Sequence, residues 1–269
     1  MLNMFLLLFL LQKKFKYMGK TLILTLFLVS TALFAQENEV PKSNETVENK
    51  NMLKVNLLAL TVGNYSLQYE RLITPKTTIG VTANYTPKRG LPFMSSFETI
   101  LDDQNTTDQL ENFKYASYSI TPEVRFYLGK EGYKGFYIAP FARYTAYNDV
   151  HLPITYETTD NGTTTESIVL IEGKSTALSG GFAIGAQWKL SKKLYLDWMI
   201  MGPHFGSTDI DLKGNKALSI EDQNSLRDEI ESLDVPFDID YEIDENGVRA
   251  KTKTPWGGVR ASIGIGYRF

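Results

Sequence analysis

The stretch PWGGVRASIGIGYRF, residues 255–269, decides the fold. From Val259 to Phe269 every second residue is aliphatic or aromatic, and the residues between them are glycine, serine or arginine. This period of two indicates a β-strand with one apolar face and one face of small or charged side chains. Such a pair of faces is typical of a closed barrel in lipid, where the apolar face points outward and the interior is narrow.

The same alternation recurs along the chain and predicts eight strands. They cover residues 53–61, 65–73, 77–86, 115–128, 135–147, 175–190, 194–207 and 255–269. From the second connection onward, short and long connections alternate, as in bacterial barrels with tight turns at one rim and long loops at the other. We therefore predict an all-β fold over residues 52–269, an eight-stranded antiparallel up-and-down transmembrane β-barrel with long extracellular loops. The first hairpin is the least regular, because Leu57 to Leu60 do not alternate.

The N-terminal region predicts export. Four lysines precede an apolar run from Thr21 to Phe34, and Ala35 follows it. This is the layout of a cleaved signal peptide, and the run is shorter than the roughly 18–20 apolar residues of a spanning helix. We predict a signal peptide over residues 1–35, with Met18 as an alternative start that would make residues 1–17 an over-extended gene start. A polar, disordered linker is expected over residues 36–51.

Composition excludes several classes of protein. The chain has no cysteine, which rules out a disulfide scaffold, a thiolate metal site, a thiol nucleophile and an acylated lipoprotein. Two histidines cannot form a three-histidine metal site. A net charge of -3 without a long Lys/Arg cluster gives no footprint for nucleic acid. We expect no cofactor, no metal and no nucleic-acid partner.

Alternation places charges of both signs on the inward face. The acids are Glu70, Glu123 and Asp197, the bases are Arg125, Arg143, Lys189, Arg260 and Arg268, and Asn56, Gln68 and Gln187 accompany them. Eight strands leave room only for side chains or one small ligand, and unpaired buried charges are costly. We therefore predict a salt-bridge network that plugs the lumen, with Glu123 paired to Arg260 or Arg143. A narrow channel is the alternative.

Two Asn-Gly pairs and a capping box organise the long loops. A turn at Asn246-Gly247 predicts an extracellular hairpin that continues into the last strand, with cross-strand pairs Asp244–Arg249, Glu242–Lys251 and Asp240–Lys253. Calcium binding by these acids is disfavoured, because Glu245 stands where an EF-hand loop needs glycine. Ser219 and Asp222 resemble a capping box before Leu226, Ile230 and Leu233, which predicts a helix on the barrel rim. Asn161-Gly162 predicts a hairpin between Ile154 and Val169, in which Glu157 faces Glu166.

Several segments together resemble a known family. They are NLLAL (56–60), SLQYERLI (66–73), PEVRFYLG (122–129), GFYIAPFARY (135–144), LDWMIMGPHFGS (196–207) and PWGGVRASIGIGYRF (255–269). As a set they resemble a Bacteroidetes family of small outer-membrane β-barrels known as a domain of unknown function. The resemblance covers nearly all of the chain after the predicted signal peptide. It implies an eight-stranded barrel and outer-membrane residence, and it implies no activity.

The expected location is the outer membrane of a Gram-negative bacterium. Tyr267 and Phe269 end the last strand and resemble the signal that outer-membrane assembly machinery recognises. We expect that machinery, membrane lipid and lipopolysaccharide as partners. The surface partner is not identified. Residues 209–253 contain thirteen acids and six bases, which favours a cationic partner or divalent ions that bridge to lipopolysaccharide.

The expected function is a structural or surface-interaction role without catalysis. The alternative is a lipid A hydrolase or acyltransferase with His204 and Ser207 as weak catalytic candidates, Asp209 as a carboxylate and His151 on a neighbouring strand. Simple alternation places His204 on the outward face, unless Gly202-Pro203 forms a bulge. We therefore expect no enzymatic activity.

Overall fold

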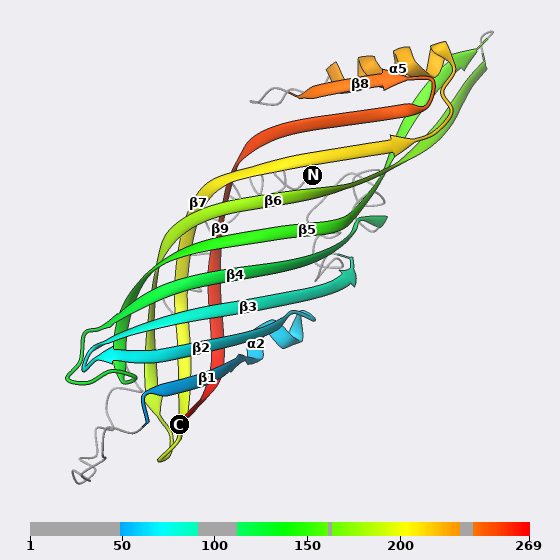
Figure 1. The fold of residues 1–269 in the computed structure, drawn as a ribbon. Coiled ribbons are helices and arrows are strands. Elements are labelled where there is room, and N and C mark those ends of the chain that lie inside the picture. Colours follow the sequence, from blue (N-terminus) through cyan, green and yellow to red (C-terminus); the bar gives the residue numbers. More distant parts are fainter. Residues whose placement is uncertain (1–48, 91–111, 161–162, 232–238) are drawn as a thin grey trace, which may run out of the picture. The chain divides into compact units, whose positions relative to one another are not determined.

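The strands form one antiparallel sheet that closes in a ring. The structure is a computed structural model that describes residues 49–90, 112–160, 163–231 and 239–269. The described strands follow the order β1-β2-β3-β4-β5-β6-β7-β9-β8, and β1 also pairs with β9 (Figure 1). The bounds are β1 Asn51–Asn56, β2 Tyr65–Thr74, β3 Thr77–Arg89, β4 Lys114–Tyr127, β5 Gly135–Asp160, β6 Thr163–Lys189, β7 Leu194–Asn215, β8 Asp240–Asp244 and β9 Gly247–Arg268. The prediction of an all-β, antiparallel, up-and-down ring is confirmed.

The N-terminal predictions fall largely outside this part of the chain. The predicted signal peptide and residues 36–48 of the predicted linker lie outside the described residues. Asn51, the last residue of that linker, already belongs to β1 and pairs with Arg71. Within the described residues, no helix is long and apolar enough to cross a membrane.

The first predicted strand is shorter than expected. β1 ends at Asn56, and helix α2 occupies Leu57–Thr61. The side chain of Asn56 accepts a hydrogen bond from the backbone N–H of Ala59 at 3.2 Å, which caps the helix. Leucine and alanine favour helix, and their lack of alternation gives a strand no preferred face. Extending the strand to Thr61 was therefore wrong.

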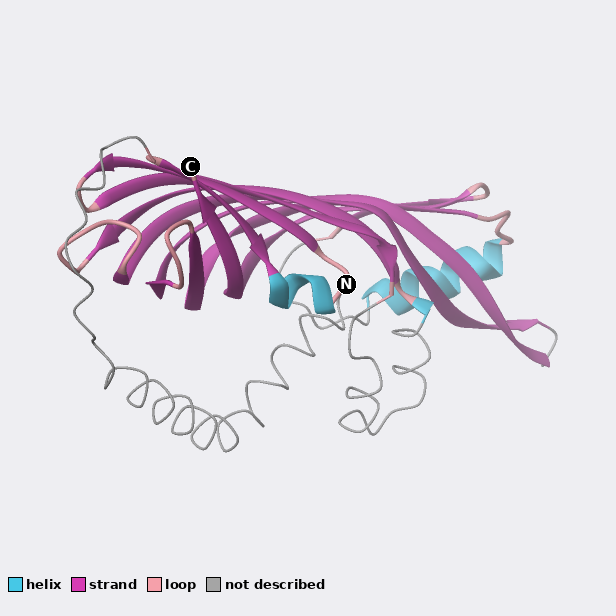
Figure 2. Ribbon diagram, turned by 90° about the horizontal axis from the view of Figure 1, so that it is seen from below, coloured by secondary structure: helices cyan, strands magenta, loops and turns pink. Residues whose placement is uncertain are grey.

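Several strands are much longer than expected. Residues 148–174 and 208–254 were predicted as long connections, but β5, β6, β7 and β9 run through large parts of both. β5 and β6 pair as far as Asp160 and Thr163, and Glu157 lies opposite Glu166 in the register that the Asn161-Gly162 turn predicts. Those two turn residues lie outside the described residues. We call the continuation beyond the ring, residues 150–160, 163–174, 208–215, 240–244 and 247–254, the projecting sheet (Figures 1 and 2).

Helix α5, Ile220–Glu231, covers one face of the projecting sheet (Figure 2). The capping box forms as predicted, because Ser219 Oγ accepts from the Asp222 N–H and Asp222 Oδ2 accepts from the Ser219 N–H, both at 3.1 Å. Leu226 is buried, and Ile230 packs on the same cluster. The other buried members of the cluster are Val169, Ile171, Leu218 and Val248. The helix is confirmed, and it packs on the projecting sheet; Leu233 lies outside the described residues.

The register of the β8–β9 hairpin differs from the prediction by two residues. Asp244 lies opposite Gly247, Glu242 opposite Arg249, and Asp240 opposite Lys251, so the turn residues are Glu245 and Asn246. Asp244 Oδ1 accepts from the N–H of Asn246 at 2.8 Å and of Gly247 at 3.1 Å. Gly247 takes φ +141°, which favours glycine. The predicted pairs Asp244–Arg249, Glu242–Lys251 and Asp240–Lys253 are therefore wrong, although acids still face bases at Glu242 and Asp240.

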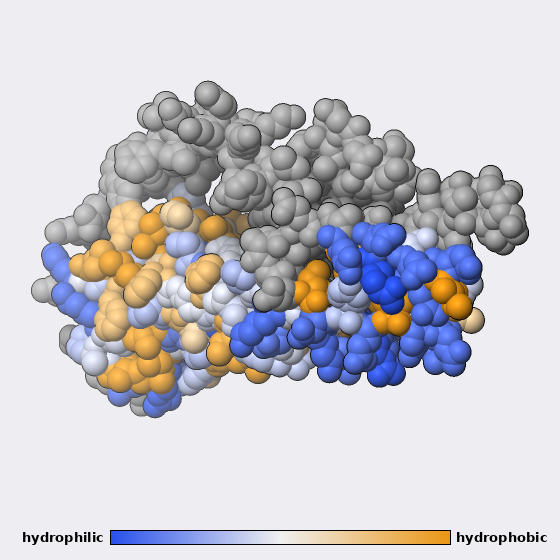
Figure 3. Space-filling model, turned by 90° about the horizontal axis from the view of Figure 1, so that it is seen from above, coloured by the Kyte–Doolittle hydropathy of each residue, from blue (hydrophilic) through white to orange (hydrophobic). Residues whose placement is uncertain are grey.

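The outer surface of the ring exposes large apolar side chains on every strand. One example from each is Leu53, Leu67, Val81, Ile120, Ile138, Ile184, Met201 and Ile263. We call this surface the apolar belt. Figure 3 shows hydrophobic residues gathered over the ring and hydrophilic residues over the projecting sheet. The interior of the ring instead buries polar and charged side chains.

Candidate functional site

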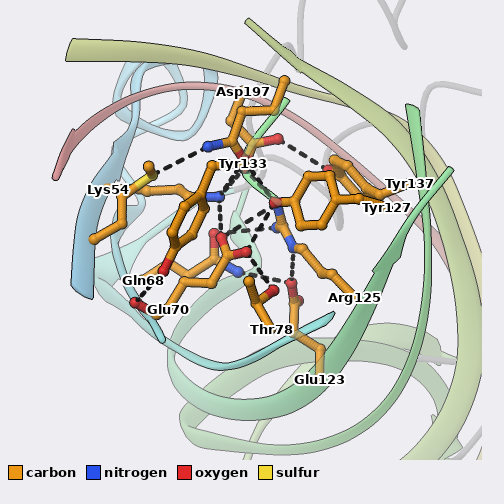
Figure 4. A network of polar contacts seen from close by, with 12 residues as sticks. Lys54, Gln68, Glu70, Thr78, Glu123, Arg125, Tyr127, Tyr133, Tyr137 and Asp197 are labelled. Atoms are coloured by element: carbon orange, nitrogen blue, oxygen red, sulfur yellow. Dashed lines mark hydrogen bonds and ion pairs between the residues drawn. The ribbon is translucent and has the colours of Figure 1, made fainter. Parts of the chain in front are cut away.

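Arg125 on β4 is the centre of a buried ion-pair network inside the ring (Figure 4). Its side chain is 1% exposed. Nε lies 2.6 Å from Glu123 Oε1, and Nη1 lies 2.6 Å from Asp197 Oδ2. Nη2 donates to Gln68 Oε1 at 3.1 Å. Because each nitrogen of the planar guanidinium finds an oxygen on a different strand, Arg125 ties β2, β4 and β7 together.

Lys54 on β1 is the second cation of the network. Its Nζ forms an ion pair with Glu70, lies 2.5 Å from Asp197 Oδ2 and donates to Gln187 Oε1 at 3.0 Å. Lys54 is absent from the inward-facing charges predicted from the sequence. The signal was available, because Lys54 precedes the inward-facing Asn56 by two residues and therefore shares its face.

Hydroxyl groups satisfy further carboxylate oxygens. Glu70 Oε1 accepts from Thr78 Oγ1 at 2.5 Å and from the Tyr127 hydroxyl at 2.8 Å, and the Tyr137 hydroxyl donates to Asp197 Oδ1 at 2.9 Å. Gly185 leaves the space that Tyr137 fills, because a Cβ at this position would overlap the Tyr137 hydroxyl. The small inward residues of β6 thus make room for the network.

An aromatic layer closes the ring below the network, at the end with short turns. Tyr133 in the β4–β5 turn is fully buried, and its hydroxyl donates to the Lys50 carbonyl at 2.6 Å. It takes φ +65°, a conformation that is uncommon for residues other than glycine. Its ring packs against Tyr127 and Tyr195. The network and this layer together fill one end of the lumen, and we call them the plug.

The structure brings together five of the predicted network residues and places the others elsewhere. Glu70, Glu123, Arg125, Asp197 and Arg260 are in the network. Arg268 is not, because its Nε donates to the Asn49 carbonyl at 2.7 Å and its Nη1 to the Tyr195 hydroxyl at 3.0 Å, at the end of the last strand. Its assignment to the network was wrong. Lys189, also predicted to face inward, is exposed.

Arg260 and Arg143 both face the lumen, Arg260 at the edge of the network and Arg143 beside it. Arg260 Nη2 lies 3.6 Å from Glu123 Oε2, so Arg260 is the partner of Glu123 that the sequence left open. Arg143 Nε donates to Thr145 Oγ1 at 3.2 Å. Among the described residues, no carboxylate lies within ion-pair distance of Arg143. Arg143 is therefore a lumen cation outside the ion-pair network.

Replacing Glu123 with glutamine should destabilise the fold. The neutral amide removes a charged partner from Arg125 and Arg260, and losing a hydrogen bond to a charged group costs about 1.5–3 kcal/mol. We expect a lower urea midpoint for Glu123→Gln and a lower folding yield in detergent micelles. Glu131→Gln, at an exposed acid in the β4–β5 turn, is the control. Equal midpoints for both variants would contradict a structural role for Glu123.

The two catalytic candidates lie on opposite faces of β7. The register of β7 shifts between Met199 and Gly202, and this bulge turns His204 inward, opposite Gly181 and Gly258. Ser207 lies opposite Leu178, whose side chain is on the outer surface. The outward position expected for His204 from simple alternation was wrong, because the strand bulges at Ile200 and Met201, just before the Gly202-Pro203 pair at which a bulge was considered.

The remaining candidates lie apart from the network. His151 Nε2 lies 3.1 Å from Glu172 Oε1 on the neighbouring strand. Asp209 lies 3.8 Å from Lys253 on the projecting sheet. Tyr267 and Phe269 are exposed on the outer surface with their rings stacked at 6.4 Å. No group of three His, Cys, Asp or Glu residues in the described ranges could hold a metal ion.

The fold and the network define a class: an all-β protein whose closed antiparallel ring holds charged side chains inside and apolar ones outside. The chain belongs to the family described as Protein of unknown function (DUF3575), whose model matches residues 22–209. The resemblance to a family of unknown function is thereby confirmed. No curated protein matches the sequence.

Solved structures similar to the chain include a bacterial β-barrel domain. It is the N-terminal beta-barrel domain of Pseudomonas aeruginosa OprF, with 8% identity and a TM-score of 0.27. The alignment covers 82% of this chain and 98% of that one. At this TM-score the similarity supports no conclusion about this chain.

Proposed function

We propose that the protein is an outer-membrane β-barrel of a Gram-negative bacterium with a plugged polar lumen and a structural or surface-interaction role. The observation that carries this proposal is the apolar belt around an ion-paired interior. Phe205 is 71% exposed and Val259 is 68% exposed, whereas Arg125 and Glu70 are buried. Soluble proteins rarely expose apolar surface over so wide an area, and lipid removes the cost of doing so. The resemblance to a Bacteroidetes barrel family and the predicted signal peptide also support this location.

The projecting sheet supports a role at the cell surface. β5 has 26 residues and β6 has 27, whereas about 9–11 residues suffice for a strand to cross a bilayer. The excess lies at the end of the ring opposite the short turns, which bacterial barrels keep in the periplasm. The acidic residues of this region favour cationic groups, including divalent ions that bridge to lipopolysaccharide.

We further propose that the barrel neither catalyses a reaction nor conducts ions. The opposite orientations of His204 and Ser207 support the first point, because a base must lie within hydrogen-bond reach of the nucleophile that it activates. The plug supports the second, because its side chains occupy the lumen from β1 to β7. If the lumen is closed, planar-bilayer recordings of the purified protein should show no single-channel conductance steps.

Gel mobility with and without boiling tests the proposal. A closed membrane barrel resists dodecyl sulfate until heated, so we expect the protein in outer-membrane fractions to run as a faster unboiled band that shifts on boiling. The physical reason is the closure of the ring by β1 and β9, which leaves its strands without a free edge at which unfolding could start. An unshifted band found in the soluble fraction would overturn the membrane location.

A further inference from the structure

A cavity of about 490 Å³ lies inside the ring next to the plug. Its lining includes Lys54, Arg125 and Asp197 from the network and Leu58 and Ala59 from α2. The cavity therefore extends from the network towards the rim that carries α2. Uncharged donors and acceptors line the wall between them: Asn56, Asn64, Ser66, Thr82, Asn84 and Thr86. Its volume is that of a site for a small molecule.

The charges around the cavity do not balance. In the described part of the chain, the network and the cavity wall hold four cations, Lys54, Arg125, Arg143 and Arg260. They hold three carboxylates, Glu70, Glu123 and Asp197. Lys54 and Arg125 contact all three carboxylates, and Arg260 shares Glu123 with Arg125, so the excess positive charge lies at Arg143 and at the shared Arg260. Buried charges are usually paired, so the missing charge indicates a negative ligand.

Of the two arginines, Arg260 contacts one carboxylate, Glu123 at 3.6 Å, whereas Arg143 has only uncharged hydrogen-bond partners among the described residues. The Arg260 guanidinium stacks over the Phe141 ring at 4.5 Å, and Arg143 is fixed by its hydrogen bond to Thr145. Both line the cavity, and their charges repel each other. Arg260 Nη1 is buried without a hydrogen-bond partner among the described residues. Such a donor is costly to leave unpaired, and an oxyanion would satisfy it.

We propose that this cavity binds a small soluble oxyanion, a phosphate or carboxylate compound, between Arg143 and Arg260. The planar fork of each guanidinium matches the paired oxygens of either group. The asparagine, serine and threonine side chains of the wall would bind hydroxyl groups or further oxygens of the same ligand. The proposal needs only the closed ring, so it stands or falls separately from the membrane location.

Calorimetric titration of the full-length mature protein in non-ionic detergent tests this site. The probes are inorganic phosphate and succinate in separate titrations, which distinguishes the two oxyanion classes. We expect at least one probe to bind with one-to-one stoichiometry. Arg143→Gln should weaken that binding about 10- to 100-fold, the effect of one lost charge-assisted pair. Arg143→Lys keeps the positive charge but lacks the planar fork of the guanidinium. Its affinity for the probe should therefore lie between those of the wild type and Arg143→Gln.

Arg249→Gln is the matched control, because Arg249 is an exposed arginine on the projecting sheet. It should bind the probe as the wild type does. Gel mobility with and without boiling is measured for every variant. A heat-dependent shift shows that the ring is closed, so that weak binding by that variant does not come from misfolding. The proposal is overturned if neither probe saturates the wild-type protein at about 20 mM, because a site with a millimolar dissociation constant would be saturated at that concentration. It is also overturned if Arg143→Gln binds as tightly as Arg249→Gln.

Discussion

The Arg125→Gln variant should lose about 3–5 kcal/mol of unfolding free energy, which is the cost of removing one partner from a buried ion pair. Arg125 contacts Glu123, Asp197 and Gln68 at 2.6–3.1 Å, and Glu70 at 3.7 Å. Without it, three buried carboxylates would depend on Lys54 and Arg260 alone. Urea unfolding in lipid vesicles or micelles, followed by tryptophan fluorescence, measures the loss.

Two further variants control this result. Arg71→Gln changes an exposed arginine whose guanidinium donates a 2.9 Å hydrogen bond to Asn51, so it should cost less than about 1 kcal/mol. Arg125→Lys keeps the charge and should recover part of the folding yield if Arg125→Gln fails to fold. Wild-type stability of Arg125→Gln would mean that water already solvates the carboxylates. The narrow channel would then become the better description of the lumen.

Alternation predicted which way the side chains face wherever the two faces differ in chemistry and the strand is regular. In β4, Ile120 is exposed and Thr121 is buried; in β6, Leu178 is exposed and Ser179 is buried. A shift of one residue would bury the apolar set among charges, so the register is strongly specified. The same alternation predicts that Glu123, Arg125 and Asp197 face inward, and all three are buried in the structure.

The missed residues depend on features that alternation does not contain. Lys54 is the exception, because it shares the inward face of β1 with Asn56 and regular alternation predicts its position. Tyr133 lies in a turn, and its position under the network depends on a positive φ that a tyrosine rarely adopts. His204 was assigned to the wrong face because the bulge in β7 adds one residue to the strand. The positions of Tyr133 and His204 are thus set by local backbone geometry.

Strand length was underestimated because it is decided by pairing between distant segments. Residues 209–213 alternate between charged and aliphatic side chains, which suits a loop or an exposed strand equally. In the structure Asp209 lies opposite Lys253 and Asp211 opposite Lys251, with side-chain distances of 3.8 and 3.6 Å. Opposite charges across a strand pair favour this register. Neither segment shows the pairing by itself.

Ile184→Arg should destabilise the protein by about 2–4 kcal/mol, the cost of an arginine on the lipid face near the bilayer midplane. Ile184 on β6 is 43% exposed and lies between Ile138 and Met201, which are exposed as well. In water, a charged side chain at an exposed position changes stability by less than about 0.5 kcal/mol. Unfolding from lipid vesicles therefore reports whether lipid or water surrounds this surface.

Ile168→Arg makes the same substitution on the same strand and is the matched control. Ile168 is 60% exposed, and the even-numbered residues Ile168, Leu170, Leu178 and Ile184 all face outward, so the two sites share one face of β6. Sixteen residues separate them, about 50 Å along a strand. Even with a tilt of about 45° that exceeds the apolar band of about 25 Å. If Ile184 lies in lipid, Ile168 lies outside it, and Ile168→Arg should leave the stability unchanged.

Two outcomes would contradict this expectation. Equal, small losses of stability at both sites would mean that the ring is surrounded by water. Equal, large losses would mean that the projecting sheet is itself covered by lipid or by a partner.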